Sequence, residues 1–251
     1  MPLTPAAPTL SALTLPAIAR SALLLDLDGT LLDLAPTPEA VTVPPGLIDA
    51  LLALRPLLSD ALAIISGRPV DQIDALLPGV PFAVAGEHGG ALRRAPGGAL
   101  TRPDLPSIPD GWVNAASRIV ASSPGARLEE KLRGFVVHYR AIPHAGLALR
   151  VALDGLVTDA RFEIMAASMA WEVRPRGIDK GTAVSQLMQE PPFKGRLPLF
   201  IGDDVTDHDA IRTADAMGGV GLLVETAFGT PAAVRAWLAA AASESRWPGL
   251  R

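Results

Sequence analysis

Two carboxylates stand two residues apart, Asp26 and Asp28, directly after the apolar run 22–25 and just before Gly29. Side chains alternate along an extended chain, so residues two apart point the same way. Two carboxylates on one side, with a glycine next to them, could hold a hard divalent cation or serve as an acid and a base. Taken alone, the pair is equally typical of a solvated turn at the end of a strand.

Two further apolar runs also end in polar residues. Ser66 follows the run 61–65, and Asp203 follows the run 197–201 after one glycine. Lys180 lies in a loop that leads into a predicted helix. Parallel strands share a carboxyl edge, so these groups can converge on one crevice that holds acids, a hydroxyl and an ammonium. Such a set suits a phosphoryl group bound with magnesium, although Ser66 alone could be a turn serine and Lys180 a solvated lysine.

The sequences DLDGT at 26–30, Ser66, Lys180 and GDDVTD at 202–207 resemble, in this order, the four motifs of the haloacid dehalogenase superfamily of phosphohydrolases. The resemblance implies an α/β fold, a doubly wound Rossmann-like parallel sheet with an inserted α+β cap domain. It also implies that Asp26 attacks phosphorus to form an aspartyl phosphate, and that Asp28 is the general acid and base.

The same resemblance implies further roles for the motif residues. Mg2+ would be held by the Asp26 carboxylate, the backbone carbonyl of Asp28 and the Asp203 carboxylate. Ser66 and Lys180 would hold the phosphoryl oxygens. Two more acids would support the ligands without binding the ion: Asp204 and Asp207. Arg68 could contact the phosphate or form a surface pair.

The elements that must position these residues follow from hydrophobic periodicity and turn signals. We predict a core domain in two parts, 1–103 and 175–251, and a cap domain, 104–174, that selects the substrate. Core strands are predicted at 22–25, 61–65, 81–85, 197–201 and 221–224, and core helices at 46–55, from Pro69, 180–189, 207–216 and from Thr230. Proline at 56 is expected to end the first helix. Cap helices are predicted at 111–122 and 146–158, and cap strands at 126–132, 135–140 and within 162–173.

Strand alternation divides the predicted cap sheet into an apolar and a charged face. The charged face takes its residues in pairs from three strands: Glu129 with Lys131, His138 with Arg140, and Glu172 with Arg174. Such a face could be ordinary solvated surface. Mixed charged donors and acceptors also suit a sugar, whose hydroxyls need both kinds of partner.

The sequences LEEK at 128–131, VHYR at 137–140 and EVRPRG at 172–177, with GDDVTD, resemble the signatures of the trehalose-6-phosphate phosphatase family. The resemblance implies hydrolysis of trehalose 6-phosphate, the last step of trehalose biosynthesis, with the disaccharide gripped by Glu129, Lys131, Arg140 and Glu172. His88 matches a family histidine, but Glu87 precedes it where the family acid comes later. His208 stands where the family usually has glutamate.

Composition narrows the setting of this chemistry. The chain has 251 residues, a net charge of −4 and no cysteine, which argues against nucleic-acid binding and disulfides and fits a reducing cytoplasm. Residues 1–20 lack a basic start and contain four prolines, so we expect a loose arm rather than a signal peptide. No apolar run is long enough to span a membrane. We therefore expect a cytoplasmic monomer that acts on a small molecule.

Two other functions remain open at this stage. One is a phosphatase of the same superfamily for another sugar phosphate, of the sucrose-phosphate or mannosyl-glycerate phosphate type. The other is a phosphate-sensing or scaffolding module without turnover. The pair of Asp26 and Asp28 argues against the module, because binding alone needs no general acid two residues from a nucleophile. A receiver domain would lack this pair and would be about half as long.

Overall fold

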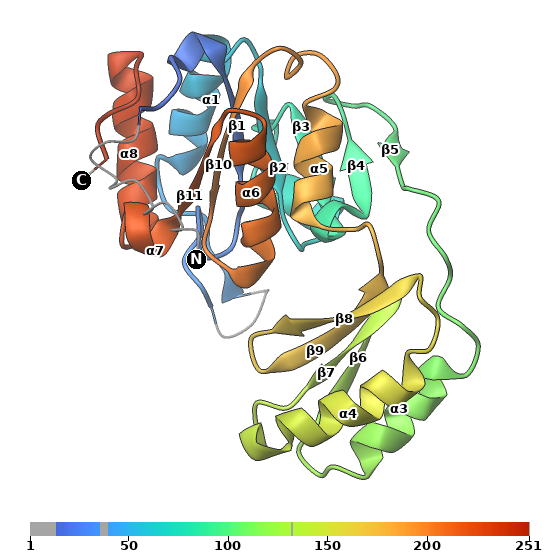
Figure 1. Ribbon diagram of the computed structural model, residues 1–251. Helices are drawn as coiled ribbons and strands as arrows, with labels where there is room; N and C mark the ends of the chain where they lie inside the picture. Colours follow the sequence, from blue (N-terminus) through green and yellow to red (C-terminus); the bar gives the residue numbers. More distant parts are fainter. Residues whose placement is uncertain (1–13, 36–39, 132, 251) are drawn as a thin grey trace, which may run out of the picture. The chain divides into compact units, whose positions relative to one another are not determined.

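The structure is a computed structural model that describes residues 14–35, 40–131 and 133–250. Most of the predicted arm, residues 1–13, lies outside the described residues, and Ile18–Arg20 form a short 3-10 helix before the first strand. The described residues form two compact units. One is the continuous segment Arg102–Ile178, and the other is made of the chain on either side of it (Figure 1).

The larger unit is built on one sheet, whose described strands run in the order β11-β10-β1-β2-β3-β4-β5. β1 (Ser21–Leu25) pairs in parallel with β2 (Leu62–Ile65) on one side and with β10 (Leu197–Gly202) on the other. β3 (Ala83–Gly86) and β11 (Val220–Leu223) extend this parallel set. The doubly wound α/β sheet predicted from the sequence is confirmed.

Two short strands continue the sheet beyond β3. β4 (Ala91–Arg93) pairs antiparallel with β3, and β5 (Leu100–Thr101) pairs antiparallel with β4. Neither strand was predicted from the sequence. Strands of two or three residues are too short to show an alternation of apolar and polar residues, so only their turn residues are visible in the sequence.

Helices cover both faces of the sheet, as Figure 1 shows. Leu23 and Leu25 of β1 belong to one hydrophobic core, and Ala22 and Leu24 belong to the core on the opposite face. The first core also receives buried side chains from α1 (Leu47–Leu57), α2 (Val70–Leu76) and α8 (Pro231–Glu244), and the second from α5 (Lys180–Leu187) and α6 (His208–Ala216). A strand buried on both faces must be apolar throughout, which explains the uninterrupted apolar run before Asp26.

Two helices show how local sequence sets their ends. Pro56 lies inside the last turn of α1 and does not end it, contrary to our expectation; the helix continues for one more residue. At α8, Thr230 accepts a hydrogen bond from the N–H of Ala233 and Pro231 is the first helical residue, as predicted. A single turn, α7 (Val224–Ala227), follows β11 where we had predicted the end of that strand.

The segment after α8 folds back on the start of β1. The indole ring of Trp247 stacks on that of Trp237, with centroids 5.0 Å apart and an angle of 3° between the planes. Trp247 donates its Nε1–H to Ser21 Oγ (3.1 Å), and Trp237 donates to the carbonyl of Pro248 (2.9 Å). These contacts fix the amino end of the strand whose other end carries Asp26.

The smaller unit has a four-stranded antiparallel sheet in the order β6-β7-β9-β8 among its described strands. Its strands are β6 (Arg127–Lys131), β7 (Gly134–His138), β8 (Phe162–Ala167) and β9 (Ala170–Pro175). Two helices, α3 (Trp112–Ala121) and α4 (Gly146–Leu156), share a separate hydrophobic core with one face of this sheet. β7 ends two residues earlier than predicted, which leaves Arg140 in the following turn.

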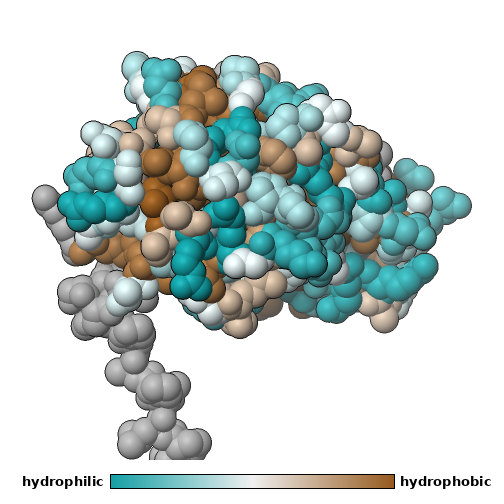
Figure 2. Space-filling model, turned by 90° about the horizontal axis from the view of Figure 1, so that it is seen from above, coloured by the Kyte–Doolittle hydropathy of each residue, from teal (hydrophilic) through white to brown (hydrophobic). Residues whose placement is uncertain are grey.

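On the face shown in Figure 2 hydrophilic residues predominate, and hydrophobic residues gather in one band. Among the helices of the described residues, none has both the length and the apolar run required to cross a bilayer.

Candidate active site

The predicted polar residues of the larger unit meet where β1, β2, β3 and β10 end. In the pairing of β1 with β10, Leu25 lies opposite Ile201, and the N–H of Asp26 donates to the carbonyl of Ile201 (2.9 Å). This register places Asp26 next to the acidic residues that follow Gly202. The convergence predicted from separate apolar runs therefore arises directly from parallel pairing.

Gly29 shows how closely the two acidic segments approach. Its φ is +80°, a left-handed conformation that favours glycine, and it begins the turn after Asp28. A Cβ on this residue would lie 2.0 Å from Oδ2 of Asp203. The absence of a side chain at this position is therefore a condition for bringing the Asp203 carboxylate over the end of β1.

Three carboxylates form a cluster that could hold a metal ion: Asp26, Asp203 and Asp207 each offer an oxygen within 4.8 Å of the others. The hydroxyl of Thr30 lies 3.2 Å from Oδ2 of Asp26 and 3.3 Å from Oδ1 of Asp203, so it can donate to either. Our candidate residues did not include Thr30, although it belongs to the DLDGT sequence. The donors are all hard oxygens, which fit a cation such as Mg2+ or Ca2+.

Lys180 lies between two of these carboxylates. Its Nζ donates to Oδ1 of Asp26 and to Oδ1 of Asp207, both at 2.6 Å, and its side chain is buried. It is the first residue of α5, where Asp179 caps the helix by accepting from the N–H of Thr182 (2.7 Å). A lysine at the positive end of a helix is unfavourable in isolation, and here two carboxylates offset that cost.

The electrostatics of the cluster favour added positive charge. Burial raises the pKa of Asp26 to about 8, against the opposing effect of the Lys180 ammonium, while Asp207 and Asp203 raise it further. Burial and the neighbouring Asp207 also raise the pKa of Asp203. The two carboxylates raise the pKa of Lys180 above its usual range, against the opposing effect of its burial, so it stays protonated. A bound cation would favour the ionised carboxylates.

Asp207 supports the loop that carries Asp203. Its Oδ2 accepts hydrogen bonds from the backbone N–H groups of Asp203 (3.0 Å) and Asp204 (2.9 Å), and its Oδ1 accepts from Lys180. Both oxygens are thus engaged, which fits the predicted supporting role better than direct binding of a cation. Asp204 is exposed and bonds the N–H of Val205, and the atypical His208 is exposed at the start of α6.

A second group of contacts lies at the ends of β1 and β2. It involves Ser66, Arg68 and Asp28. Ser66 is buried at the end of β2, and its Oγ accepts from the backbone N–H of Arg68 (3.2 Å). The guanidinium of Arg68 binds both oxygens of Asp28, from Nε to Oδ2 at 2.6 Å and from Nη2 to Oδ1 at 2.7 Å. In the structure Arg68 is thus paired with the carboxylate of Asp28, the predicted general acid.

His88 lies in a 3-10 turn after β3, next to the segment 66–68. The backbone N–H of His88 donates to the carbonyl of Ser66 (2.9 Å), and that of Glu87 donates to the carbonyl of Arg68 (3.0 Å). A Cβ on Gly67 would lie 2.6 Å from Nε2 of His88, so the imidazole packs directly on that glycine. The histidine therefore belongs to the same group of residues as Ser66.

In the smaller unit the predicted division of the sheet into two faces is confirmed. Register pairs Glu129 with Val136, Val136 with Glu172 and Arg127 with His138, so these residues share one face. The other face provides Phe135, Val137, Phe162 and Val173 to the core. Two ion pairs lie on the charged face, Lys131 with Glu172 (3.6 Å) and Arg174 with Glu163 (3.0 Å), and the His138 ring is hydrogen-bonded to the Glu129 carboxylate (2.8 Å).

Two details of this face differ from our expectation. Arg140 is exposed in the turn beyond β7, so it does not extend the pairing of His138 within the sheet. Glu163 on β8 belongs to the face and was missed. Its alternation with Phe162 and Ile164, which face the core, would have indicated it, but the boundary between β8 and β9 was not visible in the sequence.

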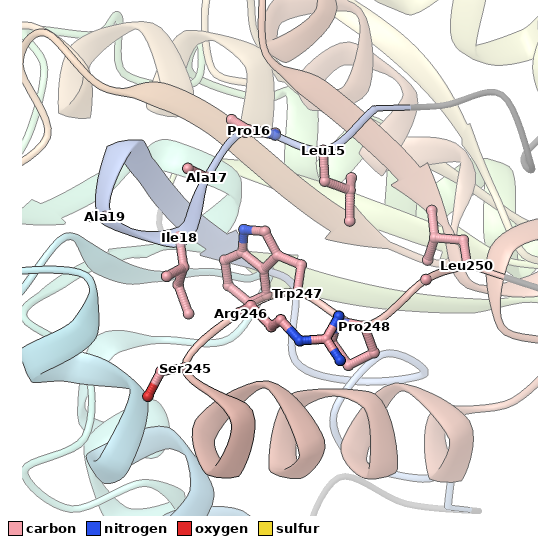
Figure 3. Close-up of a pocket in the computed structure, with 11 residues that line it drawn as sticks. Leu15, Pro16, Ala17, Ile18, Ala19, Ser245, Arg246, Trp247, Pro248 and Leu250 are labelled. Carbon is pink, nitrogen blue, oxygen red and sulfur yellow. The ribbon is translucent and has the colours of Figure 1, made fainter.

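A cavity of about 390 Å³ lies elsewhere in the larger unit, between the chain before β1 and the segment after α8. Figure 3 shows Ile18, Trp247 and Arg246 around it. The Arg246 guanidinium pairs with Glu244 (2.7 Å). The lining of this cavity is mainly apolar and lacks the carboxylates of the cluster, so the cavity is not a candidate for phosphoryl chemistry.

Comparison with known proteins gives a consistent result. The family model described as trehalose-phosphatase matches residues 24–233. A trehalose-6-phosphate phosphatase of Escherichia coli K12 is 35% identical over 214 residues, which cover 83% of this chain and 79% of that protein. A probable trehalose-phosphate phosphatase of Sinorhizobium fredii is 39% identical over 209 residues, covering 81% and 77%.

Solved structures agree at the level of the fold. The C-terminal domain of a Candida albicans trehalose-6-phosphate phosphatase has a TM-score of 0.71 at 20% identity, covering 89% of this chain and 92% of that one. An Aspergillus fumigatus trehalose-6-phosphate phosphatase has a TM-score of 0.64 at 24% identity, covering 91% and 94%. A related structure of the haloalkanoate dehalogenase superfamily also shares the fold, with a TM-score of 0.50. Because the family model spans most of the chain, this protein belongs to the trehalose-phosphatase family.

Proposed function

We propose that the protein hydrolyses trehalose 6-phosphate to trehalose and inorganic phosphate, the last step of trehalose biosynthesis. The observation that carries the proposal is the position of Asp26, which lies at the end of β1 with Lys180 at 2.6 Å and the Asp203 carboxylate beside it. Phosphoryl transfer depends mainly on alignment and charge neutralisation, and this group supplies both. The family and its named relatives supply the substrate.

The residues fit Mg2+ as the cofactor. The Asp26 carboxylate, the Asp203 carboxylate and the backbone carbonyl of Asp28 would hold it, because all three are hard oxygen donors at one edge of the sheet. When bound, the ion would neutralise charge on the phosphoryl oxygens. The Asp28 carboxylate itself is engaged with Arg68, which fits the proposal that this residue would bind the ion through its main chain.

The reaction is proposed to proceed in two steps on the protein's own residues. In the first, a carboxylate oxygen of Asp26 attacks phosphorus, the bond to the sugar oxygen breaks, and that oxygen takes a proton from Asp28. In the second, Asp28 takes a proton from a water whose oxygen attacks phosphorus, which releases phosphate and restores the Asp26 carboxylate. Lys180 and Ser66 are proposed to orient the phosphoryl oxygens.

The segment Arg102–Ile178 is proposed to be the cap domain that selects the sugar. The charged face of its sheet offers acceptors on Glu129 and Glu172 and donors on Lys131 and Arg174, with His138 among them. Hydroxyl groups of a disaccharide need both kinds of partner. Arg140, in the turn after β7, and His88 and Arg68 of the larger unit complete the proposed substrate contacts. We also propose a cytoplasmic monomer; the lack of cysteine is compatible with a reducing compartment.

The test measures release of phosphate by the purified protein with Mg2+. Trehalose 6-phosphate is compared as substrate with sucrose 6-phosphate and mannosyl-glycerate phosphate. Release from the trehalose ester should exceed that from the other two, and chelation of Mg2+ or the substitution Asp26→Asn should abolish it. Robust turnover by the Asp26→Asn protein would reject Asp26 as the nucleophile. Preference for either other sugar would reassign the substrate and keep the reaction.

A further inference from the structure

The contact between Arg68 and Asp28 points to a role for Arg68 in proton transfer. We propose that Arg68 is a positioning residue, which orients the Asp28 carboxylate toward the leaving oxygen of the substrate. The inference rests on the proposed phosphatase function. It differs from the simpler expectation that this arginine only binds the phosphoryl group.

The geometry of the pair fixes the plane of the carboxylate. Two parallel hydrogen bonds, of 2.6 Å and 2.7 Å, join Nε and Nη2 of Arg68 to the two oxygens of Asp28. The Arg68 side chain is 12% exposed and that of Asp28 is 28% exposed, so the pair is partly shielded from water. A single hydrogen bond would leave the carboxylate free to rotate, whereas a bidentate contact sets both its position and its orientation.

Arg68 is itself held firmly by its surroundings. Its backbone N–H donates to Oγ of Ser66 (3.2 Å), and its carbonyl accepts from the N–H of Glu87 (3.0 Å). A Cβ on Gly86 would lie 2.8 Å from that same carbonyl oxygen, so the end of β3 packs tightly against the backbone of Arg68. The guanidinium therefore extends from a fixed point.

The turn that holds Arg68 is conformationally costly. Glu87 and His88 both have left-handed backbones, with φ of 54° and 56°. Such a conformation is strained for a residue other than glycine and persists where the surrounding structure requires it. Here it directs two consecutive N–H groups to the carbonyls of Arg68 and Ser66. This strain is consistent with selection for an accurate position of the segment 66–68.

The proposed proton transfer requires one of the two bonds to open. As the bond between phosphorus and the leaving oxygen breaks, that oxygen takes a proton from one carboxyl oxygen of Asp28. The second oxygen keeps its hydrogen bond to Arg68, which preserves the orientation of the group. The arginine therefore matters most when the leaving oxygen is strongly basic and needs the proton.

Another pair in the same unit provides a matched control. Arg93 of β4 also binds both oxygens of a carboxylate, that of Asp74 on α2, at 2.5 Å and 2.7 Å. Its side chain is 17% exposed, close to the value for Arg68. Both contacts are bidentate, Arg93 binding through Nη1 and Nη2 and Arg68 through Nε and Nη2, but Asp74 is not among the residues that surround Asp26. Arg93→Ala thus reports the loss of such a pair without an effect on proton transfer.

The test compares two small esters of similar size, p-nitrophenyl phosphate and phenyl phosphate, whose leaving groups differ in basicity. For Arg68→Ala we expect kcat/KM to fall by about tenfold more on phenyl phosphate than on p-nitrophenyl phosphate, since general acid catalysis contributes roughly 10²–10⁴ in rate. Arg68→Lys, which can donate to one oxygen only at a time, should be intermediate. Arg93→Ala should show equal losses on the two esters.

A double variant separates positioning from direct binding of phosphate. If Arg68 acts through Asp28, adding Arg68→Ala to Asp28→Asn should cause no further loss on phenyl phosphate. Equal losses on both esters, or a full additional loss in the double variant, would overturn the proposal and leave Arg68 as a phosphoryl contact. Wild-type protein that cleaves both esters but not trehalose 6-phosphate would refute the proposed substrate alone. Cleavage of neither ester nor trehalose 6-phosphate would overturn both proposals. If the wild-type protein cleaves trehalose 6-phosphate alone, the comparison of Asp28→Asn with the double variant is made on that ester, and the same outcomes decide.

Discussion

Lys180 is the residue on which the charge balance of the site depends. Its ammonium lies 2.6 Å from Asp26 and 2.6 Å from Asp207, and all three side chains are buried. Removing one partner from a buried ion pair leaves an uncompensated charge, which is more costly than replacing the whole group with apolar residues. Stability and chemistry therefore share one side chain.

The substitution Lys180→Met should destabilise the protein by about 3–5 kcal/mol, because two buried carboxylates would face each other without a cation. Denaturant unfolding of the metal-free protein measures this loss. The control is Lys194→Met, a lysine that lies between α5 and β10 and outside the site, for which a change within about 0.5 kcal/mol is expected. If Lys180→Met lowered the free energy of unfolding by no more than Lys194→Met, Lys180 would not be the counter-ion of the two acids.

Binding of Mg2+ should strengthen as pH rises toward 8. Burial raises the pKa of Asp26 to about 8, so below that pH the proton and the cation compete for the same carboxylate. Calorimetric titration between about pH 6 and about pH 8 should show an affinity that rises by up to about tenfold per pH unit, with release of a proton.

The matched control for this titration is Asp154→Asn, which removes an exposed acid of the smaller unit and should preserve the pH dependence. Asp26→Asn should abolish it. An affinity that does not change with pH in the wild-type protein would contradict the assignment of Asp26 as the titrating ligand.

At this scale the sequence predicts which residues meet but not how they pair. Asp26, Ser66, Lys180 and Asp203 each follow or precede an element whose end is visible in the sequence, so parallel pairing brings them together. The contact between Arg68 and Asp28 depends on a turn and two side-chain rotamers, and no periodicity encodes those. Thr30 was not among the predicted site residues, because hydroxyl residues are common in turns that have no role in a site.

At the scale of elements, α5 and α6 cross at unusually close range. A Cβ on Gly181 would lie 2.7 Å from the carbonyl oxygen of Asp209 and 2.6 Å from the hydroxyl of Thr213. The close approach matters because Gly181 directly follows Lys180, and α6 directly follows the loop that carries Asp203. Separation of the two helices would therefore displace residues on both sides of the site.

Gly181→Ala should destabilise the protein by about 1–3 kcal/mol through this overpacking, and should lower phosphatase activity. Gly155→Ala in α4 is the opposite control, since no atom lies within 4 Å of its added Cβ and the residue is exposed in a helix. It should stabilise by about 0.5–1 kcal/mol. Thermal unfolding of the two variants in parallel would refute the packing argument if both shifted in the same direction.

Elements with a helical or strand period, or with an uninterrupted apolar run, were predictable, and elements with neither were not. The apolar stripes of the helices and the alternation of β7 and β9 follow from burial on one or both faces. Buried positions take apolar residues, so burial can be predicted from residue type. β4, β5 and α7 are as short as the predicted strands β2, β3 and β11 or shorter, and they lack the uninterrupted apolar run that marks those strands. Pro56 is tolerated because it stands in the final turn of α1, where the helix is about to end.

At the scale of the whole molecule, the two units have separate cores and separate proposed tasks. One carries the carboxylate cluster, and the other carries a sheet face with Lys131 and Glu172 paired at 3.6 Å. That distance is long for a hydrogen bond. Replacing this contact by contacts to substrate hydroxyls would therefore cost little free energy. Specificity and chemistry should then respond to different substitutions.

Lys131→Ala and Glu172→Ala should lower kcat/KM for trehalose 6-phosphate by about tenfold or more, with little effect on p-nitrophenyl phosphate, because each removes a sugar contact worth about 1.5–3 kcal/mol. Arg150→Ala, which breaks an exposed pair with Asp154 on α4, is the control in the same unit. Equal losses on the two substrates would remove the charged face from substrate selection.

The strand order has a consequence for how the protein is made. β1 lies between β2 and β10, yet β10 follows the whole segment Arg102–Ile178, and Thr30 and Asp203, which meet in the site, are 173 residues apart. Synthesis proceeds from the amino end, so the ribosome delivers every residue of the smaller unit before β1 can obtain this neighbour. Until then a strand that is apolar from Ala22 to Leu25 presents an unpaired edge, which is a template for association with other chains. The growing polypeptide should therefore depend most on chaperones in the interval between the emergence of β1 and that of β10.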